Sequence, residues 1–241
     1  MKILIGTAGW SLPRAEQEHF AGTGSHLERY AARFRVVEIN SSFHRSHRAA
    51  TWLRWRDSVP ERFRFSVKMP KAITHTQKLL ATDALVEAFL AEAGALGDKL
   101  ACLLVQLPPS LVFDAAVAAE FMEKLRSRTP VRVACEPRHE SWFTAEADEL
   151  LNTFQVARVA ADPARVAAAA SPGGWRGMSY YRLHGSPKIY YSAYDANFIT
   201  ALARDVAREA GAGPDVWVIF DNTTLGAATR NALDLAQAVG S

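Results

Sequence analysis

The stretch VRVACEPRH, residues 131–139, contains the pattern that decides the expected fold. Its first five residues are an apolar, β-branched run of the kind that forms a buried strand. The polar residues Glu136, Arg138 and His139 follow immediately. A stretch with helical spacing comes next, at 145–154. The segment therefore predicts a strand, a polar loop and a helix in that order.

The same order recurs outward from this stretch in both directions. Apolar runs typical of strands occur at 3–7, 36–39, 63–67, 100–105, 131–135, 156–161, 178–183 and 216–220. Stretches with helical spacing occur at 26–34, 47–57, 83–95, 114–127, 145–154, 196–210 and 226–239. Asp83, Asp114 and Asp195 are the expected N-caps of three of them. This alternation predicts a single TIM-barrel-like (β/α)8 domain over residues 1–241.

Two further features bear on that architecture. The stretch 162–177 contains Pro163, Pro172 and a Gly-Gly pair, so we expect a weak or missing helix after the sixth strand. An open doubly wound sheet is the alternative fold. It is disfavoured because no G-x-G-x-x-G or P-loop pattern follows any predicted strand.

Composition excludes several classes of protein. The chain is 49% hydrophobic and 22% charged, with a net charge of +3, as in an ordinary globular protein. Beyond the N-terminus, the longest apolar stretch runs from Leu100 to Val105, which is too short to span a membrane. We therefore expect a cytoplasmic protein with no membrane partner. Cys102 and Cys135 are too few for a disulfide framework, and strand alternation puts them on opposite faces of adjacent strands.

Basic residues are concentrated in the segment 29–78. It holds nine Arg and three Lys against three acidic residues. Aromatic residues are interleaved with them at 52–56 and 63–65, a pattern that can contact a phosphate backbone and stack on bases. The solvated face of an amphipathic helix explains the same pattern. Nucleic acid is therefore an alternative partner, and nuclease- or repair-like chemistry is the alternative function.

Polar side chains directly follow the predicted strands. In a barrel the carboxyl ends of the strands meet at one rim, where the active site lies. We therefore expect a polar pocket at that rim. Its candidate catalytic groups are Glu136, His184, Glu38 and Lys68. Its candidate substrate-binding groups are Arg138, Arg182, Asn40, Gln106, His139, Asn222 and Thr223. Helix capping explains Asn222 and Thr223 equally well.

Several kinds of chemistry are open to this rim. Glu38 and Glu136 end strands that lie three apart, so we expect their carboxylates to be further apart than the roughly 5–9 Å of a glycosidase pair. A divalent metal held by Glu38, Glu136, Asp162 and His184 is an alternative that the cations of the rim oppose. Lys68 can form a Schiff base if it loses its proton, but a salt bridge to Glu38 or Glu136 is the commoner fate of such a lysine and would keep its pKa high.

Strand alternation also predicts which side chains point inward. If Glu136 points into the barrel, then Ala134 and Arg132 do so as well. In the same way, an inward Asp162 brings Ala160 with it. We expect Glu136, Arg138, Arg182 and His184 to meet in one pocket, because the fifth and seventh strands flank the sixth.

The strand endings also carry a resemblance to a known family. The motifs are GTAGW at 6–10, VVEINSSFHR at 36–45, FSVK at 65–68, Thr74-His75, VQLPPS at 105–110, CEPRHESW at 135–142, AADP at 160–163, YYRLHG at 180–185 and FDNTTLGAATRNALDL at 220–235. In this order and spacing the chain resembles the YecE-like family, domain of unknown function 72. The resemblance covers nearly the whole chain and implies a single TIM-barrel-like domain. It supplies no reaction, because the family is named for lacking one.

The chain departs from the family pattern at three places. Residues 11–24 replace a stretch that is usually rich in Tyr. His44 stands where Tyr is commoner, and Asp221 stands where Asn is common. The resemblance therefore implies a different substrate fit near the first loop and the second strand.

These observations predict an enzyme, a hydrolase or another acid/base catalyst, that acts on a phosphorylated or otherwise anionic small molecule. Glu136 is the expected acid or base, and His184 is a second proton-transfer group. Arg138, Arg182 and Lys68 are the expected anion clamp. No organic cofactor is expected, because the usual NAD, PLP and haem motifs are missing.

Overall fold

Strands and helices alternate along the chain as the sequence pattern predicts. The computed structural model describes residues 3–240. Its strands are β1 (Ile3–Thr7), β2 (Val36–Ile39), β3 (Arg64–Lys68), β4 (Leu100–Gln106), β5 (Arg132–Glu136), β6 (Val156–Arg158), β7 (Ala160–Asp162), β8 (Gly173–Gly174), β9 (Met178–Leu183) and β10 (Asp215–Phe220). Its α-helices are α1 (His26–Arg33), α2 (Ala49–Asp57), α3 (Asp83–Ala93), α4 (Ala115–Arg128), α5 (Ala145–Thr153), α6 (Ala196–Gly211) and α7 (Ala227–Ala238).

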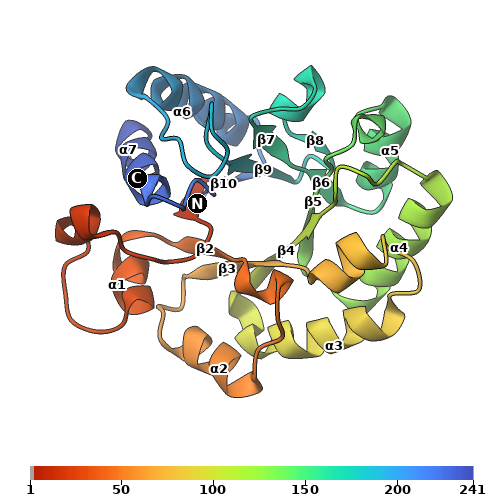
Figure 1. Ribbon diagram of the computed structural model, residues 1–241, viewed down its shortest axis with the longest axis horizontal. Helices are drawn as coiled ribbons and strands as arrows, with labels where there is room; N and C mark the ends of the chain where they lie inside the picture. Colours follow the sequence, from red (N-terminus) through yellow and green to blue (C-terminus); the bar gives the residue numbers. More distant parts are fainter. Residues whose placement is uncertain (1–2, 241) are drawn as a thin grey trace.

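The strands form two sheets that are almost entirely parallel. One sheet has the order β1-β10-β9-β7, and the other has the order β2-β3-β4-β5-β6-β8. Within residues 3–240, only the pairing of β6 with the two-residue β8 is antiparallel. Figure 1 shows the α-helices arranged around the strands. The chain therefore has a mixed α/β fold built on parallel sheets.

The two sheets approach each other between β1 and β2. Ala8 and Glu38 form an isolated parallel bridge there, and the amide of Gly9 donates to the carbonyl of Glu38 over 2.8 Å. The Tyr30 hydroxyl joins the same strands, since it donates to the carbonyl of Val36 and accepts from the amide of Thr7, each over 2.9 Å.

The expected sixth strand is divided in two at Val159. β6 pairs with β5, whereas β7 pairs with β9 in the other sheet. The strand pairings of residues 3–240 therefore do not form a single closed ladder. The region after the sixth strand is irregular, as predicted, because it contains only the 3-10 helix η6 (Ala167–Ala170) and β8 before β9 begins.

The core has two layers. The inner layer lies between the sheets and consists of Val36, Cys102, Leu104, Ala134, Ala157, Val159, Met178, Tyr180, Trp217 and Ile219. The outer layer lies between the strands and the helices and includes Cys135. Cys102 and Cys135 are both buried free thiols, so their predicted placement on opposite faces is confirmed.

Two of the three predicted N-caps are confirmed. The side chains of Asp114 and Asp195 accept hydrogen bonds from the amides of Val117 and Phe198. The prediction for Asp83 is wrong, because Asp83 is the first residue of α3 and the N-cap is Thr82. The Asp83 carboxylate instead forms ion pairs with α4. No helix within residues 3–240 combines the length and apolarity needed to cross a membrane.

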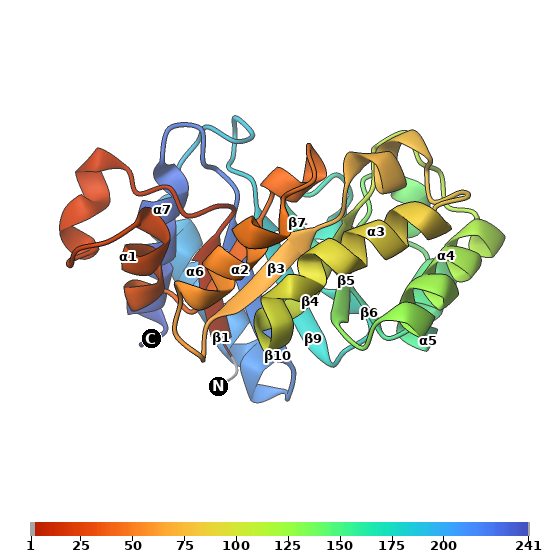
Figure 2. The ribbon, with the colours of Figure 1, turned by 90° about the horizontal axis from the view of Figure 1, so that it is seen from below.

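The fold gathers the loops that carry the candidate site at one end of the strands. Figure 2 shows the loops that follow β9 and β10 at the upper edge and the N- and C-termini toward the lower edge. Because parallel strands point the same way, the residues that end them lie together at the loop side.

Candidate active site

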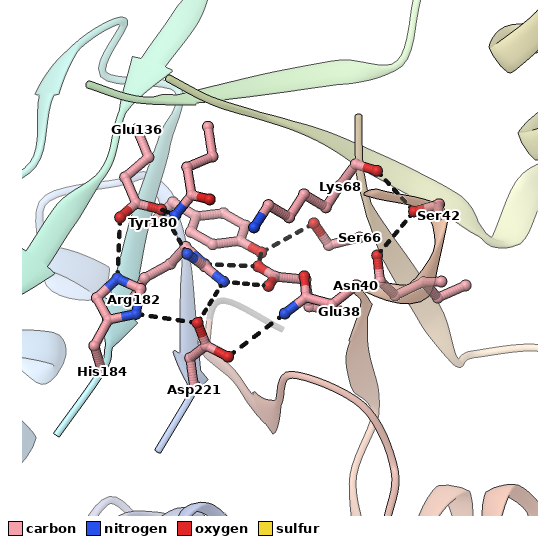
Figure 3. Close-up of polar contacts among 12 residues, drawn as sticks. Glu38, Asn40, Ser42, Ser66, Lys68, Glu136, Tyr180, Arg182, His184 and Asp221 are labelled. Atoms are coloured by element: carbon pink, nitrogen blue, oxygen red, sulfur yellow. Dashed lines mark hydrogen bonds and ion pairs between the residues drawn. The ribbon is translucent and has the colours of Figure 1, made fainter. Parts of the chain in front are cut away.

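Seven polar side chains from the ends of six strands meet in one buried cluster (Figure 3). They are Glu38 of β2, Lys68 of β3, Gln106 of β4, Glu136 of β5, Arg182 and His184 at the end of β9, and Asp221 after β10. Each residue is at most 9% exposed. The cluster therefore combines charged groups with an environment largely screened from water.

Arg182 lies at the centre of the cluster. Its Nε and Nη2 donate to the two carboxylate oxygens of Glu38 over 3.0 and 2.7 Å. Its Nη1 donates to Glu136 Oε2 over 2.6 Å, and its Nη2 donates to Asp221 Oδ2 over 2.9 Å. Burial alone would lower the pKa of Arg182, but Glu38, Glu136 and Asp221 raise it well above its ordinary value. The guanidinium therefore stays charged and fixes the positions of three carboxylates.

Glu136 is an ionised carboxylate that accepts hydrogen bonds from several side chains of the cluster. Its Oε1 accepts from Arg138 Nε over 2.9 Å, and its Oε2 accepts from Gln106 Nε2 over 3.1 Å in addition to Arg182. Burial raises the pKa of Glu136, but the charges of Arg182, Arg138 and His184 hold it well below its usual range. The predicted meeting of Glu136, Arg138, Arg182 and His184 is confirmed by these contacts.

The imidazole of His184 lies between two carboxylates. Its Nδ1 is 3.0 Å from Asp221 Oδ2, and its Nε2 is 3.0 Å from Glu136 Oε1. Arg138 Nη2 lies 3.1 Å from the same Nε2. Only the protonated ring can donate to both carboxylates, whereas the neutral ring can accept from Arg138. His184 can therefore exchange a proton without losing every polar partner.

Asp221 is the partner that orients this imidazole. Burial raises the pKa of its carboxyl group, but Arg182 and His184 lower it to a net value below the ordinary one. Asn40 Nδ2 reaches the other oxygen of Asp221 at 3.5 Å, so Asn40 lies at the edge of the cluster.

Lys68 differs from its expected environment. A salt bridge to Glu38 or Glu136 was predicted, but within residues 3–240 these carboxylates form their ion pairs with Arg182, Arg138 and His184. The Lys68 ammonium instead lies 4.1 Å from the centroid of the Phe43 ring. Burial and then the charge of Arg182 lower the pKa of Lys68 to about 8, against the opposing effect of the carboxylates. The expectation of a high pKa is therefore wrong.

A cavity of about 130 Å³ lies beside the cluster. Its polar lining includes His184, Arg138 and Arg165, and its apolar lining includes Phe143 and Ile189. The Arg138 side chain is 16% exposed and lines this space. A small anion entering the cavity would meet two arginines and an imidazole.

Comparison with known proteins identifies the family. The protein-family model described as "Protein of unknown function DUF72" matches residues 4–241 of this chain. The chain belongs to this family. The YecE protein of Escherichia coli K12, UPF0759, is 31% identical over 152 residues, which cover 62% of this chain and 54% of that protein. YunF of Bacillus subtilis 168, also UPF0759, is 28% identical over 148 residues, covering 59% and 52% respectively. The chain therefore spans about half the length of the curated relatives it matches.

Solved structures of other DUF72 proteins have the same fold. A DUF72 family protein from Enterococcus faecalis superposes with a TM-score of 0.84 at 22% identity, covering 99% of this chain and 96% of that one. A DUF72 family protein from Thermotoga maritima superposes with a TM-score of 0.82 at 24% identity, covering all of both chains. At this identity the likeness establishes the fold alone.

Four predicted site residues of this DUF72 chain lie elsewhere. Asp162 was expected to point inward with Ala160, but Val159 lies in the inner layer and Ala160 in the outer one, so Asp162 faces outward as well. Its Oδ1 accepts from the Tyr194 hydroxyl over 2.7 Å. His139 accepts from the amide of Ser141 and caps the short helix η5 (Glu140–Trp142).

Asn222 and Thr223 hold the loop rather than face the cluster. Asn222 Nδ2 donates to the carbonyl of Ser192 and to Asn231 Oδ1. The carbonyl of Thr223 accepts from the amide of Gly226 over 3.1 Å. The interpretation of these residues as helix caps is wrong, because the N-cap of α7 is Gly226 and no side chain of residues 3–240 caps that helix.

The expected set of metal ligands does not assemble in this DUF72 chain. Asp162 is outside the cluster, and the Arg182 guanidinium lies between the carboxylates of Glu38 and Glu136. Within residues 3–240, no group of three or more His, Cys, Asp or Glu side chains is arranged to hold a metal ion.

Sequence reasoning missed two members of the site. The Tyr180 hydroxyl donates to Glu38 Oε2 over 2.8 Å and lies 2.9 Å from Ser66 Oγ. Tyr180 is two residues before Arg182, so strand alternation puts both side chains on the inner face. That spacing was the signal that could have found it. Asp221 directly follows the apolar run at 216–220 and was noted as a departure from the family pattern, but it was not among the candidate site residues.

Proposed function

We propose that this protein is an enzyme that binds a phosphorylated or otherwise anionic small molecule at the loop end of its strands. The two sheets would act together there as a TIM-barrel-like scaffold. The observation that carries the proposal is the cavity of about 130 Å³ lined by Arg138, Arg165 and His184. Two cations favour an anion, and the imidazole can transfer a proton to or from it.

The anion contact is assigned to Arg138. Its Nε and Nη2 contact Glu136, which holds the side chain in place where it lines the cavity. A planar guanidinium offers paired donors that match phosphate or carboxylate oxygens. Arg165 adds a second charge from the loop after β7.

Proton transfer is assigned to His184, with Glu136 and Asp221 as the groups that position it. His184 lines the cavity, whereas Glu136 is fully buried and accepts from two arginines and Gln106. Arg182 and Glu38 then serve to hold these carboxylates. This assignment moves the acid/base role from Glu136 to His184.

The alternative partner, nucleic acid, receives less support. The basic residues of the segment 29–78 are divided between the two ends of the strands. Arg35 precedes β2 and Arg64 begins β3, whereas Arg45 follows β2 and Lys68 ends β3. A phosphate backbone would need them on one continuous face.

Binding of inorganic phosphate to matched variants tests the proposed function. Isothermal titration of the wild type should show binding at millimolar or lower concentrations. Arg138→Gln should weaken it at least about tenfold, since a charge-assisted hydrogen bond contributes about 1.5–3 kcal/mol. Arg176→Gln is the control, because Arg176 is an exposed residue paired with Glu209. Equal affinities of Arg138→Gln and the wild type would contradict the proposal, as would no binding of phosphate, sulfate or citrate.

A screen of phosphomonoesters and carboxylates for turnover then tests the catalytic part. Any activity found should be lost in His184→Asn, while phosphate binding persists. Activity that survives this change would remove His184 from the reaction.

A further inference from the structure

Lys68 has the position of a nucleophile and not of an ion-pair partner. It ends β3 inside the polar cluster and is only 9% exposed (Figure 3). Its Nζ lies over the Phe43 ring, while the carboxylates of Glu38 and Asp221 form their ion pairs with Arg182. The amine therefore sits among charges without being neutralised by a direct partner in residues 3–240.

A cavity lies next to Phe43, the residue whose ring the Lys68 ammonium contacts. The Ser42 hydroxyl donates to the carbonyl of Lys68 over 2.7 Å, which joins β3 to the short helix η2 (Ser41–Phe43). Ser42 and Phe43 also line a cavity of about 330 Å³, together with Arg45 and Lys71. Phe43 thus contacts the Lys68 ammonium and also lines a second cavity, whose charged lining residues are Arg45, Lys71 and Glu92.

We propose that Lys68 Nζ is a nucleophile that forms an imine with a carbonyl group of the substrate. The proposal rests on the proposed function and narrows the substrate class: the anionic molecule would also carry an aldehyde or ketone group. The amine lone pair forms the C–N bond while the carbonyl π electrons move to oxygen. After proton transfer the C–O bond breaks, one water leaves, and the cationic imine remains without any oxidation or reduction.

The groups that face Lys68 support this chemistry. Burial and the Arg182 charge lower the amine pKa to about 8, while Glu38, Glu136 and Asp221, from three other strand ends, act in the opposite direction. His75, in the π-helical turn η3 (Ala72–Thr76), also interacts with Lys68. The pKa of His75 is lowered by burial and then by the charge of Lys68. A larger fraction of this amine is unprotonated at neutral pH than for an exposed lysine, whose pKa is about 10.4.

Competitive reductive methylation of the wild-type protein tests the proposal. Limiting formaldehyde with cyanoborohydride at pH 7 traps imines as methylamines, and peptide mapping locates them. Formaldehyde is so small that the size of the reagent does not determine which lysine side chains it reaches. Lys68 should react at least about tenfold faster than the exposed Lys71 and Lys78, with a rate that rises through a midpoint near about pH 8. The same reaction in urea should remove this difference.

Pyruvate, which carries both a carbonyl and an anion, is the second probe. Cyanoborohydride should trap it at Lys68 in the wild type and in Lys78→Arg, a change at an exposed lysine outside the cavity, but not in Lys68→Arg. Methylation of Lys71 and Lys78 with Lys68 untouched would overturn the proposal, as would pyruvate trapping spread over exposed lysines. An unreactive Lys68 in a protein that still binds phosphate rejects the imine alone. A reactive Lys68 in a protein that binds no anion rejects the proposed anion site alone.

Discussion

The guanidinium of Arg182 donates to both carboxylate oxygens of Glu38, a residue 144 positions earlier in the chain. Both side chains are completely buried. This pair connects the two sheets, because Arg182 belongs to β9 and Glu38 to β2. The contact that centres the candidate site is therefore also a contact between the sheets, and its loss should affect stability as well as function.

We expect Glu38→Gln to destabilise the protein by about 3–5 kcal/mol, since removing one partner leaves the buried charge of Arg182 undercompensated. The Tyr180 hydroxyl would lose a charged acceptor in the same change. Urea unfolding followed by circular dichroism measures the effect. Asp205→Asn is the control, because it breaks the exposed pair with Arg208 and should cost less than about 1 kcal/mol. Similar effects for the two variants would show that Arg182 does not depend on Glu38.

Acid should destabilise the protein through Glu136 and Asp221. Both carboxyl groups have a pKa below the ordinary value in the folded protein, because Arg182 lies beside them. The stability they contribute is complete above their unfolded pKa of about 4 and is lost as the pH falls toward their lower native pKa. The urea midpoint should therefore fall steeply below about pH 4–5. Asp221→Asn should flatten this dependence, whereas an unchanged slope would mean that Asp221 is not held ionised.

The strands and helices could be predicted from the sequence because each shows a characteristic spacing of apolar residues within a short stretch. The run VVEI at 36–39 and the run MSYYRL at 178–183 match β2 and β9 to the residue. Glu136, Arg182 and His184 could be placed together for the same reason, since the ends of parallel strands converge.

The predictions that were wrong depend on interactions between residues far apart in the sequence, and the local spacing of apolar residues does not indicate such interactions. The division of the sixth strand at Val159 shows only in the pairing partners of β6 and β7. Asp162 faces outward because Val159 belongs to the inner layer and Ala160 to the outer one. The competition for carboxylates is also non-local. Arg182 forms the ion pair with Glu38, so Lys68 lacks the ion pair that was expected from its position at a strand end.

Cys102 and Cys135 should resist thiol reagents in the folded protein. Burial raises the pKa of Cys102 to about 12 and also raises the pKa of Cys135, so little reactive thiolate exists at neutral pH. Native protein should not react with Ellman's reagent over an hour, while both thiols should react at once in guanidinium chloride. Rapid reaction of the native protein, or an intramolecular disulfide found by mass spectrometry, would contradict the strand register around β4 and β5.

Binding to duplex DNA should be weak and should depend little on salt. A protein that neutralises six to ten phosphates loses roughly 10³–10⁵ in affinity between about 50 and 200 mM salt. The basic segment 29–78 is divided between both ends of the strands, which separates Arg45 from Arg35 and Arg64, so we expect a much smaller change. Fluorescence anisotropy with a labelled duplex over this salt range measures it. Arg45→Gln and Arg64→Gln, which change opposite ends of the strands, should have equally small effects. A steep salt dependence that Arg45→Gln reduces and Arg64→Gln does not would instead establish a nucleic-acid surface at the loop end, beside the candidate site.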